Sequence, residues 1–225
     1  MSKLFNYNTN EQWDYENGFY ITSHPTRIAK MIAHYELYKS IINLPGCLIE
    51  CGVLKGASLI RFATFRDILE SPYSRKIIGF DAFGHFPDQD NHDDQRFAEE
   101  FERAAGPGIS IEQLDEVFKH KSIGNYELIQ GDIIETVPQY LKKHPEIRIA
   151  LLHIDVDVYR PTLTILEHLF DRVVKNGLIV FDDYGTVEGE TRALEEYLLK
   201  KRPKVDLYLE KLPVSHIPVY IKKSI

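Results

Sequence analysis

The residues of this sequence best suited to chemistry are acidic side chains that follow short apolar runs. Each run has the length and composition of a buried β-strand. The carboxyl ends of parallel strands meet at one edge of a sheet, where ligands of open α/β proteins bind. We therefore expect these acids to gather around one site. They are Asp81 after residues 76–80, Asp132 after residues 126–130, Asp155 after residues 148–154, and Asp182 and Asp183 after residues 177–181.

Three of these carboxylates, Asp155, Asp182 and Asp183, are predicted to lie on neighbouring strands without a lysine beside them. Like charges at that spacing repel one another unless a cation neutralises them. Hard oxygen donors without a nearby cysteine favour Mg²⁺ or Mn²⁺. The sequence thus predicts a magnesium site. The alternative is that Asp182 or Asp183 only caps the turn after its strand.

The turn after the first strand of the predicted sheet, residues 50–58, has the features of a nucleoside site. Gly52 and Gly56 allow the backbone to turn tightly and to approach a ligand, and Glu50 precedes them. The three crowded glycines of a dinucleotide site are missing. S-adenosylmethionine has no phosphate, and its cationic portion suits an acidic, glycine-lined turn. Asp81 is then placed to accept the ribose hydroxyls, and Asp132 to accept from the adenine amino group.

The apolar pattern predicts five β-α units followed by a terminal hairpin. This order is typical of an α/β protein with a mostly parallel sheet and one antiparallel strand, with helices on both faces. Rossmann-like class I methyltransferases have this plan, in seven strands with the last one reversed. Strands are expected at 47–51, 76–81, 126–130, 148–154 and 177–181, helices at 57–69, 109–119, 135–143, 161–174 and 187–200, and hairpin strands at 205–209 and 217–221.

The chain is predicted to divide at about residue 45. Residues 1–45 are expected to form an N-terminal segment and helix that cover the active site. About 22 irregular residues come first, and Ser23 is the expected N-cap of a helix through Ile42. Residues 46–225 form the Rossmann-like domain, with an acidic insert at about 84–124 and a long connection over 82–108. The insert is expected to be a solvated loop or a mobile lid, from which His85 and His92 could reach an acceptor.

Composition excludes several classes of partner. The 225 residues carry a formal charge of −7, and the few basic runs lie near the C-terminus, so nucleic acid is not expected. Cys47 and Cys51 are expected to be reduced, buried thiols. No apolar run is long enough for a signal peptide or a membrane span. We expect a cytoplasmic protein that acts on a small molecule, with a homo-oligomer left open.

Several stretches together resemble the macrocin O-methyltransferase family, which methylates sugar hydroxyls in antibiotic glycosides. They are LIECGVLKGAS, FDAFG, HIDVDVYRPT, GLIVFDDYG and, nearer the N-terminus, FYITSHPTRIAKMI. The similarity covers most of residues 19–200, and the linked IDVD and FDDY segments are its most specific part. It departs from the family at Val156, where a glycine is usual, and in the acidic insert.

The resemblance implies direct methyl transfer from S-adenosylmethionine to a sugar or glycoside hydroxyl, with Mg²⁺ as Lewis acid and template. Asp155, Asp182 and Asp183 would hold the metal, and Asp157 corresponds to the proposed base. His153, Lys55, Tyr159 and His85 are weaker candidates for that base. The cofactor contacts would come from Glu50, Gly52, Gly56, Ser58, Asp81 and Asp132.

Other functions use related patterns. A catechol-type aromatic O-methyltransferase has a similar metal triad, and it is the nearest alternative. A metal-dependent glycosyltransferase also uses an Asp-x-Asp segment, but the glycine turn at residues 50–58 would then have no binding role. A dehalogenase-type phosphatase would place that segment on its first strand, and a nicotinamide dehydrogenase would need a third glycine. A binding protein without activity would not require acids at every strand end.

Overall fold

The protein, described here from a computed structural model, is an α/β fold built on one seven-stranded sheet. The structure describes residues 3–201, 208–215 and 217–224. The strand order is β5-β4-β3-β6-β7-β9-β8, and neighbours pair in parallel except at β9, which is antiparallel to β7 and β8. This confirms the predicted fold class. The strands are β3 (Cys47–Cys51), β4 (Ile77–Asp81), β5 (Tyr126–Gln130), β6 (Ile149–Ile154), β7 (Val173–Phe181), β8 (Leu209–Lys211) and β9 (Val219–Lys222).

The order of the strands fixes where a ligand can bind. The chain enters at β3 and proceeds outward to β4 and β5. It then returns across β3 to β6 and continues to β7 on the other side. The direction of winding therefore reverses between β3 and β6, and the crevice beyond their carboxyl ends is the binding place of such sheets. Both strands are wholly buried, as central parallel strands require.

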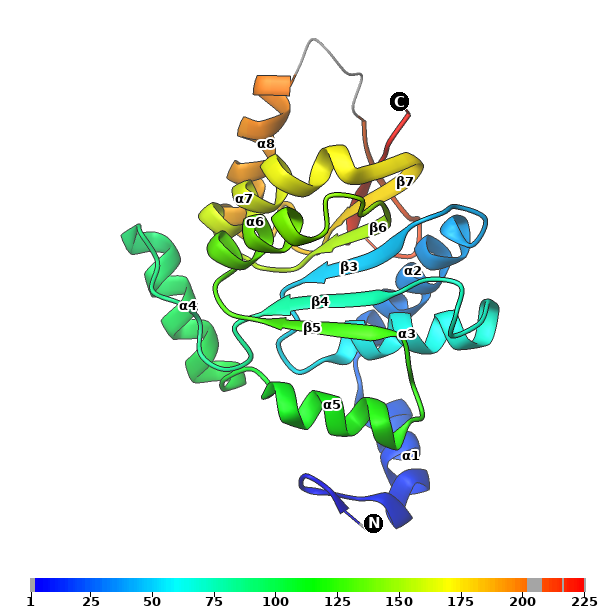
Figure 1. Cartoon of the computed structure of the whole chain (residues 1–225). Helices are drawn as coiled ribbons and strands as arrows, with labels where there is room; N and C mark the ends of the chain where they lie inside the picture. Colours follow the sequence, from blue (N-terminus) through cyan, green and yellow to red (C-terminus); the bar gives the residue numbers. More distant parts are fainter. Residues whose placement is uncertain (1–2, 202–207, 216, 225) are drawn as a thin grey trace.

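Helices cover both faces of the sheet (Figure 1), and a hydrophobic core lies on each face. One packs β3, β6 and β7 against α6 (Ile133–Lys143), α7 (Tyr159–Leu169) and α8 (Glu188–Lys201). The other packs the opposite side chains of the strands against α2 (Pro25–Ile41), α3 (Ala57–Leu69) and α5 (Ile111–His120). Ile49 lies in the first core and its neighbour Leu48 in the second. This alternation explains why the strand sequences are apolar throughout.

The helix α2 is fastened to the sheet by a buried arginine. The Arg75 guanidinium donates to the carbonyl oxygens of Ile41 and Gly46, at 3.1 Å each, and to both carboxylate oxygens of Glu70. Arg75 is only 4% exposed, so these bonds compensate for the burial of its charge. They fix the C-terminal end of α2 beside the start of β4.

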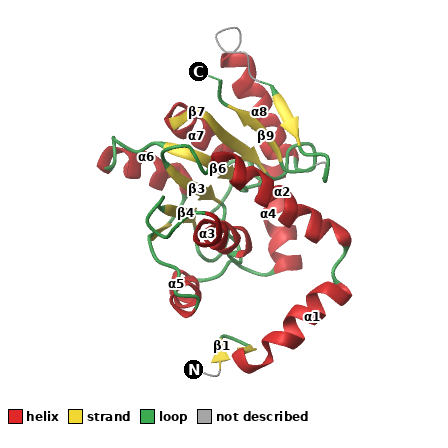
Figure 2. Cartoon of the chain, turned by 90° about the vertical axis from the view of Figure 1, so that its right-hand side faces the viewer, coloured by secondary structure: helices red, strands yellow, loops and turns green. Residues whose placement is uncertain are grey.

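The N-terminal prediction was wrong in detail. Residues expected to be irregular form a short hairpin, β1 (Lys3–Leu4) and β2 (Tyr7–Asn8), then η1 (Thr9–Glu11) and the helix α1 (Gln12–Thr22). None of the α1 side chains is buried, and Figure 2 shows the helix extending from the body of the molecule. His24, not Ser23, is the N-cap of α2, because its ring nitrogen accepts from the Thr26 N–H while Ser23 ends α1.

Two further boundaries differ from the prediction. The connection over 82–108 contains the helix α4 (His92–Ala105), and its N-cap is Asn91, whose side chain accepts from the Asp94 N–H. The helix predicted for 161–174 ends at Leu169, and β7 begins at Val173 after the short η2 (Phe170–Arg172). The terminal hairpin is confirmed as β8 and β9, although residues 205–207 of its predicted first strand lie outside the described residues.

Two predictions from composition can be compared with the structure. Cys47 and Cys51 are free, buried thiols, and burial raises the pKa of both. Among the described residues, no helix combines the length and apolar character needed to cross a membrane.

Candidate active site

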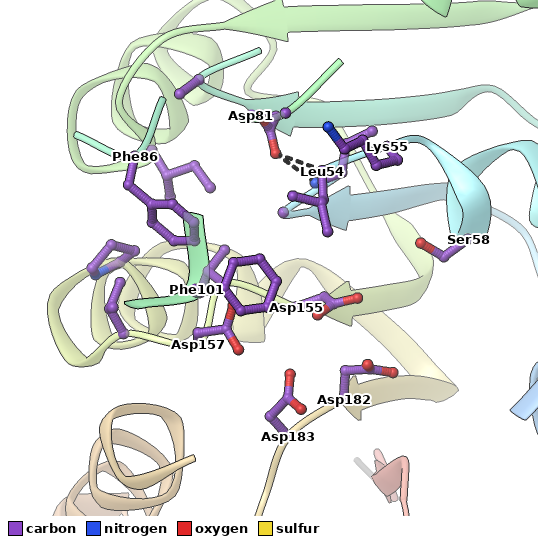
Figure 3. Close-up of a pocket in the computed structure, with 18 of the residues that line it drawn as sticks. Leu54, Lys55, Ser58, Asp81, Phe86, Phe101, Asp155, Asp157, Asp182 and Asp183 are labelled. Atoms are coloured by element: carbon purple, nitrogen blue, oxygen red, sulfur yellow. Dashed lines mark hydrogen bonds between the residues drawn. The ribbon is translucent and has the colours of Figure 1, made fainter. Parts of the chain in front are cut away.

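A cavity of about 380 Å³ opens at the carboxyl edge of the sheet, beside the point where the winding reverses (Figure 3). Its wall comes from the turn after β3, the ends of β4, β6 and β7, the start of α6, and the first part of α2. It brings together most of the residues predicted from the sequence: Gly52, Ser58, Asp81, Asp132, Asp155, Asp157, Asp182 and Asp183. Glu50 and Gly56 are absent from its wall.

The first glycine of the turn is required by a close approach of two backbones. Gly52 has a φ of +88°, and a Cβ there would lie 1.7 Å from the Asp155 carbonyl oxygen. The N–H of Asp155 also donates to the Cys51 carbonyl at 2.9 Å. The glycine therefore allows the end of β3 to lie directly against the end of β6. This contact joins the turn expected to hold the nucleoside to the strand that carries the acids.

The two acids expected near the nucleoside lie in the cavity wall and accept backbone hydrogen bonds. Asp81 receives the N–H groups of Val53 and Leu54 at 2.6 and 3.1 Å, and that of Phe83 at 2.6 Å. Asp132 is the N-cap of α6 and receives the Ile134 N–H at 2.9 Å. Oδ2 of Asp81 accepts two of these bonds, whereas Oδ1 of Asp81 and Oδ1 of Asp132 accept one each, so both acids are oriented and still have a lone pair that can accept from a ligand.

Glu50 lies behind the cavity wall. It is 0% exposed, and one of its oxygens accepts from the Ser58 hydroxyl at 2.8 Å. The other oxygen is 3.2 Å from Nδ1 of His153. Glu50 therefore reaches the cavity only through Ser58, and it holds that hydroxyl in place at the first turn of α3.

Four carboxylates crowd the opposite side of the cavity. Ligand oxygens of Asp155, Asp182 and Asp183 all lie within 4.8 Å of one another, and Asp157 is beside them. Burial, and then the charge of Asp182, raises the pKa of Asp155 and of Asp183. Burial and the neighbouring Asp183 raise the pKa of Asp157 to about 8. Asp157 has a φ of +64°, so the chain turns sharply at this residue.

A lysine lies beside these acids, contrary to the sequence prediction. Lys30 of α2 donates from Nζ to Oδ2 of Asp182, and its side chain is 24% exposed. Burial is the largest influence and lowers the pKa of Lys30, but the charges of Asp182, Asp155 and Asp183 and the hydrogen bond to Asp182 together outweigh burial and raise this pKa. The signal was present in the sequence, because Arg27, Lys30 and His34 recur at helical spacing along the predicted helix. It was missed because the partner is 152 residues away.

His153 is a buried cation between two carboxylates. Its Nδ1 faces Glu50 at 3.2 Å, and its Nε2 faces Asp182 at 3.4 Å. Burial alone would lower the pKa of His153, but the hydrogen bonds to Asp182 and Glu50 outweigh burial and raise it to about 10. Burial opposes the ionisation of Asp182, yet the hydrogen bond from His153 and the charges of His153 and Lys30 hold the pKa of Asp182 well below the usual range.

The cluster of His34, His153 and Asp182 has metal-ligand spacing, but its hydrogen bonds exclude that use. The Arg61 guanidinium can only donate, so Nδ1 of His34, 3.0 Å away, must accept. Nε2 of His34 then carries the proton, 3.7 Å from Asp182. Burial lowers the pKa of His34 to about 3, so the ring is neutral. Neither histidine therefore offers a free lone pair.

The acidic insert forms an aromatic wall on the third side of the cavity. Phe86 and Phe101 line it and meet edge to face, with centroids 5.9 Å apart. Asp94 of α4 accepts the Tyr159 N–H at 2.9 Å and so ties the insert to the start of α7. His85 lines the cavity, paired with Glu102, whereas His92 is 89% exposed and outside the wall.

The reversed strand β9 and a cavity at the switch point define a class I methyltransferase. The profile of the macrocin-O-methyltransferase (TylF) family matches residues 27–222. The chain belongs to this family and is an O-methyltransferase. The glycosyltransferase, phosphatase and dehydrogenase interpretations are therefore set aside.

Curated relatives and solved structures agree with this assignment. Demethyldecarbamoylnovobiocin O-methyltransferase from Streptomyces niveus is 27% identical over 190 residues, 81% of this chain and 68% of the relative. A tetracenomycin-C 4'-O-methyltransferase from Streptomyces olivaceus is 28% identical over 161 residues, 69% of this chain and 59% of the relative. This chain therefore spans less than two thirds of the second relative.

Two solved structures are similar over most of the chain. The calicheamicin methyltransferase CalS11 has a TM-score of 0.70 and 27% identity, covering 97% of this chain and 88% of that one. The O-methyltransferase NovP has a TM-score of 0.76 and 22% identity, covering 88% and 81%. The second likeness supports the fold alone.

Replacing Gly52 by alanine should destabilise the fold, because the new Cβ would collide with the Asp155 carbonyl in a left-handed backbone conformation. We expect the free energy of unfolding to fall by about 2 kcal/mol or more, measured by urea denaturation. Gly84→Ala is the matched control, since Gly84 lines the same cavity with nothing within 4 Å of its Cβ position. Equal stability of the two variants would contradict the close approach.

The raised pKa values predict how the stability of the metal-free protein depends on pH. Folded Asp157, with a pKa of about 8, and folded His153, with a pKa of about 10, keep protons that the unfolded chain releases. Stability should therefore fall as pH rises from 7 to 8, by about 1–2 kcal/mol per pH unit. Urea denaturation in EDTA measures this slope. Asp157→Asn should make it shallower, and stability that increases over this range would contradict the assignment.

Proposed function

We propose that this O-methyltransferase transfers the methyl group of S-adenosylmethionine to a hydroxyl of a sugar or glycoside, with Mg²⁺ required. The observation that carries the proposal is one cavity in which a glycine turn faces four clustered carboxylates. The similar proteins add support. One solved structure, 28% identical, is described as a TDP-rhamnose 3'-O-methyltransferase, and the tetracenomycin relative acts on a rhamnosyl compound.

The cofactor would lie along the turn after β3. Gly52 lines the cavity, so the backbone of this turn is accessible to a ligand. Asp81 and Asp132 would accept from the ribose hydroxyls and the adenine amino group, and Ser58 would contact the amino-acid portion. Glu50 and Gly56 would act indirectly, Glu50 by holding Ser58 and Gly56 by starting α3 with a φ of +80°.

The donor set fits a divalent cation. Asp155, Asp182 and Asp183 offer hard oxygen ligands within a small radius, and the raised pKa values of Asp155 and Asp183 record a repulsion that a cation would relieve. Bound there, Mg²⁺ would supply Lewis-acid activation and orientation of the acceptor hydroxyl. Lys30 pairs with Asp182, so on binding of the cation it would either share the Asp182 carboxylate with the metal or release it.

Asp157 is the proposed proton acceptor. It lines the cavity next to the carboxylate cluster, and its left-handed conformation separates it from the strand that carries Asp155. Burial and the charges of Asp183 and Asp182 raise the pKa of Asp157, and a cation bound by these neighbouring acids would lower it and leave the carboxylate ionised to accept a proton. His153 is unsuitable because it is 0% exposed and both of its nitrogens face carboxylates. His85 remains a more distant candidate, since it is exposed and paired with Glu102.

We further propose that residues 1–45 form a segment that covers the site of the catalytic domain, residues 46–225. Arg27 and Lys30 of α2 line the cavity, which supports a covering role for this segment. An aromatic acceptor is the second candidate substrate, because Phe86 and Phe101 form an apolar wall on which a planar ring could stack.

The purified protein should produce S-adenosylhomocysteine when mixed with S-adenosylmethionine, Mg²⁺ and a rhamnose-containing acceptor such as TDP-rhamnose. EDTA should abolish turnover, and excess Mg²⁺ or Mn²⁺ should restore it. A parallel assay with catechol distinguishes the second candidate. Failure to bind S-adenosylmethionine would refute the proposal as a whole, whereas full activity in EDTA would refute only the metal requirement.

Asp157→Asn should reduce turnover by at least about 10²-fold, because the amide cannot accept the acceptor's proton. Affinity for S-adenosylmethionine and Mg²⁺, measured by calorimetry, should stay nearly unchanged. Asp93→Asn is a control on an exposed acid of α4 and should leave turnover intact. Loss of Mg²⁺ binding in the Asp157 variant would identify Asp157 as a metal ligand instead of the base.

A further inference from the structure

One face of α2 carries a row of cationic and polar side chains, and the two nearest the start of the helix, Arg27 and Lys30, line the cavity. Arg27, Lys30 and His34 are spaced by three and four residues, so they lie along one side of the helix. Lys30 pairs with Asp182, and His34 accepts from Arg61 of α3. Arg27 is one turn nearer the start of α2, at its exposed end. The positive end of the helix dipole lies at the same place.

The cavity wall contains four lysine and arginine side chains, and two of them are already engaged. Lys30 is held by Asp182, and Lys55 donates from Nζ to the Pro107 carbonyl. The Arg27 guanidinium has no hydrogen-bonding partner among the residues that the structure describes. Arg61 uses Nη1 for His34, which leaves the rest of its guanidinium available. Among the described residues, Arg27 and Arg61 are therefore the cations of the wall whose side chains hydrogen-bond to no carboxylate or carbonyl oxygen.

These two guanidinium groups lie close enough to oppose each other's charge. Burial is the main reason that the pKa of Arg61 is lowered, and the charge of Arg27 lowers it further. Glu50 and Asp182 are the anions that act on Arg61 in the opposite direction. Both anions are occupied elsewhere, Glu50 by Ser58 and His153, and Asp182 by Lys30 and His153. The pair thus forms a positive subsite without an anion of its own.

The proposed cofactor requires such a subsite. S-adenosylmethionine ends in an amino acid, whose carboxylate must lose water when it enters the cavity. The other sides of the wall present Asp81, Asp132 and the four clustered acids, which would repel it. Figure 3 shows Ser58 across the glycine turn from the aromatic wall of Phe86 and Phe101. Arg61 is one helical turn beyond Ser58 on the same helix.

We propose that Arg27 and Arg61 together bind the α-carboxylate of S-adenosylmethionine, so that α2 closes the cofactor site over its amino-acid end. This inference rests on the proposed function, because it assumes that the cavity holds this cofactor. It adds a role for the N-terminal segment that the family motifs of the sheet do not contain. Charge-assisted bonds from two guanidinium groups match the geometry of a carboxylate.

The test compares two ligands in two variants. Decarboxylated S-adenosylmethionine keeps the adenosine, the sulfonium and the amine but lacks the carboxylate. Calorimetry at a fixed Mg²⁺ concentration should show that the wild-type protein binds S-adenosylmethionine about 10- to 100-fold more tightly than the decarboxylated compound. Arg27→Gln and Arg61→Gln should each weaken S-adenosylmethionine binding by about tenfold or more, and should leave affinity for the decarboxylated compound within about twofold.

Lys55→Gln is the matched control, because Lys55 lines the same cavity with its charge directed at a backbone carbonyl. It should leave the ratio of the two affinities unchanged. Arg27 is exposed, so its variant should fold even if loss of Arg61 disturbs His34. The inference is overturned if the wild-type protein does not discriminate between the ligands. It is also overturned if the Arg27 variant discriminates as well as the wild type, or if the Lys55 variant alone loses discrimination.

The outcomes separate this inference from the proposed function. Failure of the wild-type protein to bind either ligand would refute the cofactor itself. Binding of S-adenosylmethionine that is insensitive to both arginines would refute only the subsite.

Discussion

The structure depends on confining four carboxylates to the space where two parallel strands end. Two unit charges 4 Å apart repel by about 4 kcal/mol at the effective dielectric of a partly buried site. Asp155, Asp157, Asp182 and Asp183 can be held together only if protons or cations compensate them. Lys30 and His153 supply positive charge around Asp182, while the other three acids have raised pKa values.

This requirement explains features that packing alone does not. His153 occupies a core position of a central strand, where an apolar residue would be expected, and it bridges Glu50 and Asp182 on the neighbouring elements. The helix α2 lies where Lys30 can reach the acids and where the His34 ring stacks on Phe62, with ring centroids 4.9 Å apart. Gly52 allows the end of β3 to meet Asp155. The turn at Gly52, the four carboxylates and the helix α2 are therefore positioned by one set of charge interactions.

The sequence predicted the sheet and the acids at its edge because both follow from local patterns. Buried parallel strands are apolar throughout, and their carboxyl ends share one edge whatever the connections between them. The role of Lys30 could not be assigned from a local pattern, because its partner Asp182 lies 152 residues later in the sequence. The helix α4 was missed because its charged sequence has few apolar positions, and it is anchored by Asp94 at the start of α7.

The position of Glu50 shows a further limit of pattern-based prediction. An acid before a glycine turn is expected to face the ligand, but alternation along β3 directs this side chain into the protein. Only the structure shows that Ser58 is interposed between Glu50 and the cavity. The end of a predicted strand indicates where a residue lies in the fold. The direction of that residue's side chain depends in addition on strand register and on neighbouring charges.

The most direct test of this account is a crystal structure of the protein soaked with Mn²⁺, with anomalous scattering used to locate the metal. The account predicts one peak among the carboxylates of Asp155, Asp182 and Asp183, in an environment of oxygen ligands only. A peak between His34, His153 and Asp182, or no peak at the edge of the sheet, would contradict the central claim that these carboxylates form a metal site.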